Sequence, residues 1–131
     1  MTAKYANSTT ELQGLVAMAH ANNIAEVKAA KNDQTKPDLS LNPYEALIAM
    51  ARAFEVGEKK YSRYNYFKGH NASQLIAAAM RHLAAWNEGE ENDPVDGQPH
   101  LGSAMACCAM LLKQQELGTL KDNRYKKEDN G

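Results

Sequence analysis

The sequence predicts an all-α fold, a bundle of four helices in a single domain of 131 residues. Three observations support this prediction. Apolar residues recur at helical spacing in four segments, and no segment alternates as a half-buried strand would. Capping and helix-breaking residues stand at the ends of these segments. A chain of this length can bury a sizeable core in one domain, so we expect residues 1–131 to form a single unit.

The first helix is expected over residues 10–31, with Thr10 as a possible N-cap. One face of this helix carries Leu12, Val16, Ala19, Asn23 and Val27. A polar linker, residues 32–41, follows it.

The second helix has a clear start. Asn42 is a favourable N-cap, Pro43 suits the first turn, and Glu45 stands where a capping box has an acid. The helix is expected to end near Lys60. Its apolar stripe consists of Leu47, Met50, Ala51 and Phe54.

The last two helices are predicted from their stripes and from the residues that bound them. The third helix begins after Asn71 or Ser73 and ends near Gly89, and the fourth begins near Pro99 and stops before Gly118. The two stripes are Leu75, Ile76, Ala79, Leu83 and Trp86, then Leu101, Met105, Cys108 and Leu112.

Small residues are dense in these two helices, which permits close packing and indicates burial on more than one side, as in an oligomeric bundle. Cys107 and Cys108 are adjacent in an apolar segment, so we expect two reduced core thiols rather than a disulfide or a zinc site. The tail, residues 119–131, is polar and is expected to be flexible.

Composition excludes several classes of protein. The net charge of −1 disfavours non-specific binding to nucleic acid, which needs a basic excess. No apolar run reaches the ~20 residues needed to cross a bilayer. The first residues lack the pattern of a secretory signal. We therefore expect a cytoplasmic protein whose partners are neither nucleic acid polymers nor membranes.

Two acids conflict with the amphipathic pattern of the second helix. At about 100° per residue, Glu55 and Glu58 fall within about 40° of Ala51, inside the apolar stripe. Side chains three residues apart can converge, and buried carboxylates need a cation or hydrogen bonds. A hard cation such as Mg²⁺ would satisfy both acids. The alternative is that the helix ends earlier and both acids are solvated beside Lys59 and Lys60.

The segment after this helix, residues 61–70, combines cations with aromatic rings. Lys60, Arg63 and Lys68 alternate with Tyr61, Tyr64, Tyr66 and Phe67. Such a combination suits a nucleotide, because cations bind phosphates and a ring stacks on the base. The alternative is that the rings pack the loop onto the bundle and the charges are solvated.

Two histidines flank an acidic turn. His82 falls at the edge of the third stripe, where a hydrogen-bonded core histidine is more common than a ligand, and Arg81 falls on the far side. Asp93 belongs to the turn that precedes His100. The helix dipole favours a neutral imidazole at His100, which suits a ligand and equally an ordinary cap.

Taken together, these motifs resemble a phage-associated family, the N-terminal domain of dATP/dGTP diphosphohydrolases. The resemblance covers residues 36 to about 112, and it is carried by GEKKY, Asn65, Lys68, Gly69, Arg81, His82, Gly89, Glu90, Asp93, Pro99, His100 and Leu101. The family in turn resembles the all-α nucleoside triphosphate pyrophosphatases of the MazG type.

The resemblance implies a MazG-type bundle that assembles as a dimer or tetramer and depends on Mg²⁺ or Mn²⁺. It implies hydrolysis of purine deoxynucleoside triphosphates, dGTP and dATP, to the monophosphate and pyrophosphate. It also implies a role in remodelling a viral nucleotide pool in the host cytoplasm, including a pathway that makes 2-aminoadenine DNA.

MazG-type proteins hold their cation with an EExxE motif on one helix and an ExxD motif on the next. Glu55 and Glu58 match the last part of the first motif, with Phe54 at the leading acid, and His82 stands where the second motif would begin. The resemblance therefore implies Glu55, Glu58 and His82 as metal-binding and catalytic residues. Further ligands are left open among Glu88, Asp93 and His100.

Substrate contacts are expected from Lys60, Tyr61, Arg63, Asn65, Lys68, Arg81, Asp93 and His100. Because the second acid motif is missing, an alternative is a nucleotide-binding sensor or regulatory protein that does not hydrolyse its ligand. A third interpretation is a small interaction module whose helices serve assembly alone.

Overall fold

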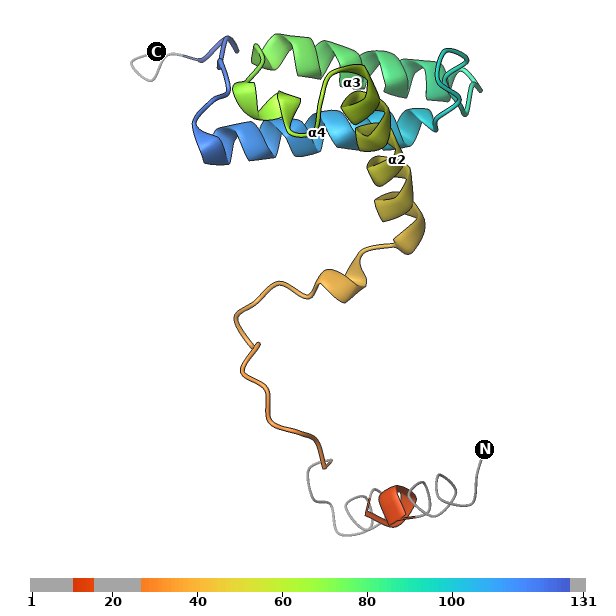
Figure 1. Ribbon diagram of the computed structural model, residues 1–131, viewed down its shortest axis with the longest axis vertical. Coiled ribbons are helices and arrows are strands. Elements are labelled where there is room, and N and C mark those ends of the chain that lie inside the picture. Colours follow the sequence, from red (N-terminus) through yellow and green to blue (C-terminus); the bar gives the residue numbers. More distant parts are fainter. Residues whose placement is uncertain (1–10, 16–26, 128–131) are drawn as a thin grey trace. The chain divides into compact units, whose positions relative to one another are not determined.

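The computed structural model describes residues 11–15 and 27–127 of the chain (Figure 1). Within these ranges the regular structure is helical and no strand forms, which confirms the all-α prediction. The chain divides into two compact units, Met1–Asp38 and Leu39–Gly131. After the helical residues 11–15, the elements are the 3₁₀-helix η1 (Leu39–Leu41), α2 (Tyr44–Lys60), the 3₁₀-helix η2 (Asn65–Lys68), α3 (Ala72–Asn87) and α4 (His100–Leu117).

The first unit contains less helix than the sequence predicts. Residues 11–15 are helical, but residues 27–33 are not, so the predicted extension to residue 31 is wrong. Leu12, Leu15 and Val27 are all exposed. A helix gains most of its stability from packing an apolar face, and these residues lack that packing. Thr10 and residues 16–26 lie outside the described residues.

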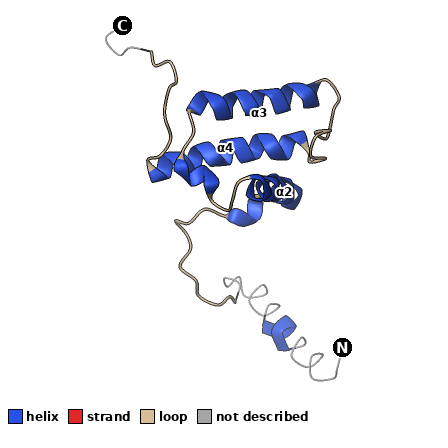
Figure 2. Ribbon diagram, turned by 45° about the horizontal axis from the view of Figure 1, so that its top comes forward, coloured by secondary structure: helices blue, strands red, loops and turns tan. Residues whose placement is uncertain are grey.

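In the second unit, α4 is the central element. Figures 1 and 2 show α3 and α4 running side by side in opposite directions, and α2 crossing α4. The crossing requires Gly102, because a Cβ at this position would lie 2.5 Å from the carbonyl oxygen of Ala49 in α2. Glycine thus allows the two helix backbones to approach closely, and it fixes the point where they meet.

The helix ends follow the local sequence signals closely. α2 ends at Lys60 as predicted, but it begins at Tyr44 with Pro43 in the cap position, so Asn42 does not cap it. At the start of α3, the Gln74 side chain accepts a hydrogen bond from the Asn71 N–H (3.1 Å). α4 ends at Gly118, which adopts the left-handed conformation (φ 74°) that glycine tolerates best.

The predicted core faces are only partly correct. The buried apolar residues are mostly small: Ala72, Leu75, Ala79, Ala104, Ala106 and Cys107. The larger residues of the predicted stripes remain substantially exposed, namely Leu47, Leu83, Trp86, Leu101 and Leu112. The helices pack through their small residues because these let the backbones approach, as at Gly102. The larger apolar side chains consequently lie on open surfaces of the unit.

The two cysteines differ in their surroundings. Cys107 is buried and free, and burial raises the pKa of its thiol. Cys108 is free but exposed, so the prediction of two core thiols is wrong for this residue. Adjacent helical residues point about 100° apart, and only Cys107 falls on the buried side of α4.

The segment after α4 makes specific contacts with the start of α3. The Lys121 N–H donates to the His70 carbonyl (2.9 Å), and the Ala72 N–H donates to the Lys121 carbonyl (2.9 Å). The Asn123 side chain accepts a hydrogen bond from the Ser73 N–H (3.0 Å). Residues 119–123 are therefore attached to the helical unit. Among the described residues, no helix is both long and apolar enough to traverse a bilayer.

Candidate functional site

A cavity of about 530 Å³ lies between α2, the loop that contains η2, and α4. Its size falls within the ~300–1,000 Å³ typical of small-molecule sites. The polar and aromatic residues that line it are Phe54, Glu55, Glu58, Tyr61, Ser62, Arg63, Tyr64, Asn65, Tyr66 and His70. Its apolar wall comes from α2 and from Ala106 and Met110 of α4. The cavity thus combines carboxylates, one guanidinium, an amide and several phenol rings.

Gln114 fixes the loop that forms one side of this cavity. Its side chain is completely buried. The amide nitrogen donates to the Tyr66 carbonyl (2.9 Å), and the amide oxygen accepts from the His70 N–H (2.9 Å). The same nitrogen lies 2.9 Å from Nδ1 of His70. One side chain therefore satisfies backbone groups on either side of Gly69.

Ring contacts hold the loop against α2. The rings of Phe54 and Tyr66 lie 5.3 Å apart, and those of Tyr66 and Phe67 lie 5.0 Å apart at nearly a right angle. Tyr66 and Phe67 therefore pack the loop onto the helices, as the simpler interpretation of this segment predicts. Tyr61 is 70% exposed, so its ring can contact a ligand, whereas the ring of Tyr64, which is 56% exposed, packs against that of Phe67 at 4.9 Å and keeps only its outer part for a ligand.

Glu55 and Glu58 both line the cavity, but they are not buried. Their side chains are 56% and 51% exposed in the single chain, so the prediction that they are buried is wrong there. The reason is that α2 packs on α4 at Ala49, and Leu47 and Ala51 of the predicted stripe stay exposed.

Both acids form ion pairs with arginines. An Arg52 nitrogen lies 2.9 Å from a Glu55 oxygen, and the Arg63 Nε lies 3.8 Å from a Glu58 oxygen. Exposed pairs of this kind are weak, worth about 0–1 kcal/mol. The two carboxylates are therefore available to a cation that enters the cavity.

The remaining predicted substrate residues divide into two groups. Tyr61, Arg63 and Asn65 line the cavity. Lys60 and Lys68 are exposed at the ends of α2 and η2 and do not line it. The other three predicted contacts, Arg81, Asp93 and His100, also lie outside the cavity lining.

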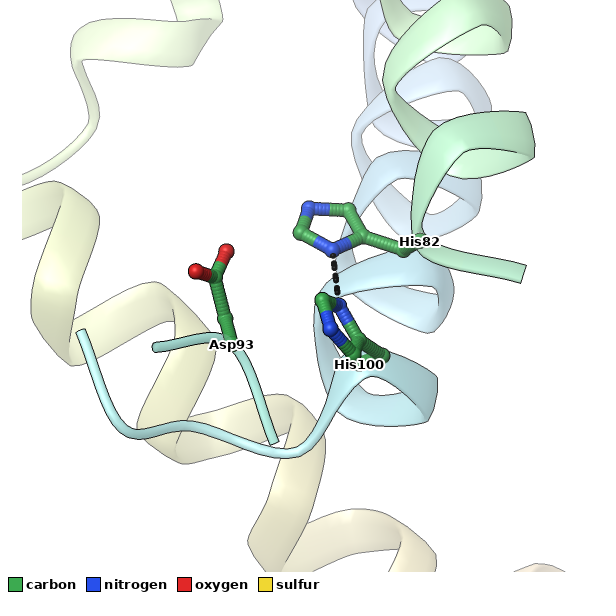
Figure 3. A group of neighbouring side chains, drawn as sticks. All are labelled: His82, Asp93 and His100. Carbon is green, nitrogen blue, oxygen red and sulfur yellow. Dashed lines mark hydrogen bonds between the residues drawn. The ribbon is translucent and has the colours of Figure 1, made fainter. Parts of the chain in front are cut away.

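His82 joins a different cluster (Figure 3). Its Nδ1 lies 2.8 Å from Nδ1 of His100, and Asp93 offers a carboxylate oxygen close to both histidines. Burial lowers the pKa of His82, and the neighbouring His100 lowers it further. Among the described residues, the atoms that could share one cation here belong to His82, Asp93 and His100, and Glu55 and Glu58 are not among them.

Sequence reasoning missed Gln114 and underrated Glu90. Gln114 lies seven residues after Cys107, so it falls on the buried face of α4, and a polar residue there is a detectable signal. Glu90 binds His100, with 2.7 Å between its carboxylate oxygen and Nε2. No spacing rule indicates this pair, because the turn between α3 and α4 brings the two residues together.

Comparison with known proteins identifies the family. No curated protein and no solved structure matches the chain. A family model described as "dATP/dGTP diphosphohydrolase, N-terminal" matches residues 26–124, which include α2, the cavity loop, α3 and α4. Because this match spans well over half of the 131 residues, the chain belongs to the dATP/dGTP diphosphohydrolase N-terminal family.

Proposed function

We propose that this protein hydrolyses purine deoxynucleoside triphosphates, dATP or dGTP, to the monophosphate and pyrophosphate. The observation that carries the proposal is the cavity beside α2, where two carboxylates lie next to a guanidinium, an amide and exposed phenol rings. In this reaction water adds to the α-phosphorus, the bond to the bridging oxygen breaks, and pyrophosphate leaves. The family description supports the substrate class.

The residues of the cavity suit the parts of such a substrate. Arg63 provides a cation for phosphate oxygens from the cavity lining, and the exposed Lys60 and Lys68 provide two more from the ends of α2 and η2. Asn65 can hydrogen bond to the base edge. The exposed ring of Tyr61 or Tyr64 can stack on the base. Binding in this arrangement would place the triphosphate near the two glutamates.

Glu55 and Glu58 would hold a divalent cation, Mg²⁺ or Mn²⁺, because hard cations prefer carboxylate oxygen. When bound, such an ion neutralises phosphate oxygens and lowers the pKa of a coordinated water. His82 does not lie with these acids in the described structure. We therefore assign the cation of the cavity to the two glutamates and not to His82.

The proposal is tested by measuring pyrophosphate release from the eight common nucleoside triphosphates, with Mg²⁺ and with a chelator. We expect turnover of dATP or dGTP that stops when the cation is removed. Saturable binding without pyrophosphate release would instead support a nucleotide sensor, an alternative that the missing second acid motif favours.

We also propose that the chain acts as a homo-oligomer, a dimer or tetramer. The buried apolar core of the second unit is small, and most of its members are alanines. Met80, Leu83, Trp86 and Leu112 meanwhile lie substantially exposed on α3 and α4. A second copy that covers these side chains would bury the apolar area that this core lacks.

The oligomer is tested by light scattering coupled to gel filtration. We expect a mass at least twice the 14.4 kDa of one chain. Leu112→Glu should shift the protein toward the monomer, because a charge would then enter the buried interface. Lys121→Glu, a charge change on the exposed segment after α4, should leave the mass unchanged. A monomeric parent protein would refute this part of the proposal.

The resemblance suggests the setting in which this activity would operate. We include in the proposal the removal of dATP or dGTP from a viral nucleotide pool in the host cytoplasm, as in synthesis of 2-aminoadenine DNA. The expected ligands are nucleotides, with no role for nucleic acid polymers or membranes.

A further inference from the structure

We propose that His82, Asp93 and His100 bind a divalent transition-metal ion such as Zn²⁺, Co²⁺ or Mn²⁺, at a site separate from the nucleotide cavity. The three residues come from α3, from the turn between α3 and α4, and from the first residue of α4 (Figure 3). Each offers one ligand atom, and these atoms all lie within 4.8 Å of one another. This inference goes beyond the proposed hydrolysis and does not depend on it.

The spacing of the two histidines fits a shared ion. Their Nδ1 atoms lie 2.8 Å apart. A metal–nitrogen bond of ~2.05 Å places neighbouring ligand nitrogens ~2.9 Å apart in an octahedral site and ~3.3 Å apart in a tetrahedral one. The imidazoles are thus already separated by nearly the distance that coordination requires. Imidazole also selects transition metals over Mg²⁺ or Ca²⁺.

Glu90 holds His100 in the orientation that coordination needs. A carboxylate oxygen of Glu90 lies 2.7 Å from Nε2 of His100, so Nε2–H can donate to it. The proton then resides on Nε2, and the lone pair of Nδ1 points toward His82. A carboxylate that orients the outer nitrogen of a histidine is the usual support of a metal-binding imidazole. His100 is only 4% exposed, so burial and this bond fix its ring.

Asp93 is positioned by its own turn. Its N–H donates to the Gln98 carbonyl (2.8 Å), and its carbonyl accepts from the Gly97 N–H (2.7 Å). One carboxylate oxygen accepts from the Val95 N–H (2.9 Å). The carboxylate therefore keeps its second oxygen for a ligand role, and the turn holds it beside the histidines without help from a bound ion.

The site lies apart from the cavity. The α4 residues that line the cavity, Ala106 and Met110, are about 9–15 Å further along the helix axis than His100.

Three protein ligands leave at least one coordination position open. An open position is typical of metal sites that exchange a water or substrate ligand, whereas structural sites are closed by four protein ligands. Water or an oxygen of a phosphate group could occupy that position. The ion would also join α3, the acidic turn and α4, so its binding should raise the melting temperature.

The experiment uses full-length protein that has been freed of metal with a chelator. Co²⁺ and Zn²⁺ are then titrated in separate runs, and binding is followed by calorimetry and by the visible absorption of Co²⁺. We expect one ion per chain at this site, with a rise in melting temperature. His82→Ala and Asp93→Asn should weaken binding at least about a hundredfold, and Glu90→Gln about tenfold to a hundredfold.

Two control variants show whether the ion binds at these three residues or responds to any nearby change of charge. Asp96→Asn removes a neighbouring charge whose carboxylate caps the Gln98 N–H, and it should retain binding within about threefold. Glu45→Gln should also retain binding, because that exposed acid lies in the first turn of α2 and belongs neither to this site nor to the cavity lining. Circular dichroism shows whether each variant is folded. Unchanged Co²⁺ binding in folded His82→Ala, or no binding by the parent protein, would leave only a hydrogen bond between two histidines and overturn the proposal.

Discussion

Glu55→Gln and Glu58→Gln are each expected to lower kcat for dATP or dGTP hydrolysis at least about a hundredfold, the loss of ~2.7 kcal/mol of transition-state stabilisation. The change keeps the size of each side chain and removes its negative charge. A carboxamide binds Mg²⁺ far less well than a carboxylate, so the cation and the phosphate oxygens it neutralises would lose their position.

Stability should change little in the same variants. Both side chains are more than half exposed, and their ion pairs with Arg52 and Arg63 are of the weak surface kind. The free energy of unfolding is expected to stay within about 1 kcal/mol of the parent value. A large fall in kcat with little change in the free energy of unfolding would show that the two acids act in catalysis and not in folding.

The matched control is Glu45→Gln, which changes an exposed acid in the first turn of the same helix and outside the cavity lining. Pyrophosphate release at saturating substrate, with added Mg²⁺, measures all three variants. Parental rates in Glu55→Gln and Glu58→Gln would remove both residues from the mechanism. A loss of activity in Glu45→Gln would instead show that the assay responds to any change of charge on α2.

The helix ends could be predicted from the sequence because their causes are local. Gly118 ends α4 through a left-handed conformation that other residues adopt reluctantly. The end of α2 at Lys60 likewise follows from the loss of helical pattern after it. Such signals act within a few residues, and they do not depend on what the helix later contacts.

The buried face of α2 could not be predicted in the same way. The periodicity predicts a buried face with Leu47 and Ala51, because the larger apolar side chains lie there. The unit instead packs at Ala49, because Gly102 of α4 admits the Ala49 backbone. That choice depends on a residue 53 positions away, which no periodicity within α2 can reveal.

The candidate site likewise has one feature that local spacing predicts and one that only the tertiary structure determines. The i,i+3 spacing correctly predicts that Glu55 and Glu58 face one region, and both line the cavity. The meeting of His82 with His100 depends on the antiparallel return of α4 along α3, so spacing alone does not indicate it. Pairings across a turn are set by tertiary structure, so the sequence alone does not place His82 beside Asp93 and His100.

Gln114→Leu is expected to destabilise the folded state by about 2–4 kcal/mol. Leucine is close to glutamine in size, so the change creates little empty space. It removes the partners of two His70 groups, the backbone N–H and the ring Nδ1, whereas the Tyr66 carbonyl keeps the Gly69 N–H as a donor (3.2 Å). A buried polar group without a partner costs about 1–3 kcal/mol, and two such groups would result. The melting temperature should fall by roughly 10–20 °C.

The same substitution should weaken substrate binding, because Gln114 holds the loop that carries Tyr61, Arg63 and Asn65. We expect the KM to rise more than the kcat falls, since the cavity acids of α2 keep their place. Gln115→Leu alters the exposed neighbour and serves as the control. Thermal unfolding measures the stability, and hydrogen exchange at the His70 amide reports on the loop directly.

Exchange at this amide distinguishes a specific role from a general loss of packing. In the parent protein the His70 N–H donates to a side chain that solvent does not reach, so its exchange should be slow. In Gln114→Leu the exchange of the His70 N–H should become fast even under conditions where α3 and α4 remain protected. The reason is that the side-chain amide of Gln114, which holds the loop to α4, is missing in this variant. If His70 stays protected and the melting temperature matches that of Gln115→Leu, the loop has another anchor, and the shape of the cavity does not depend on Gln114.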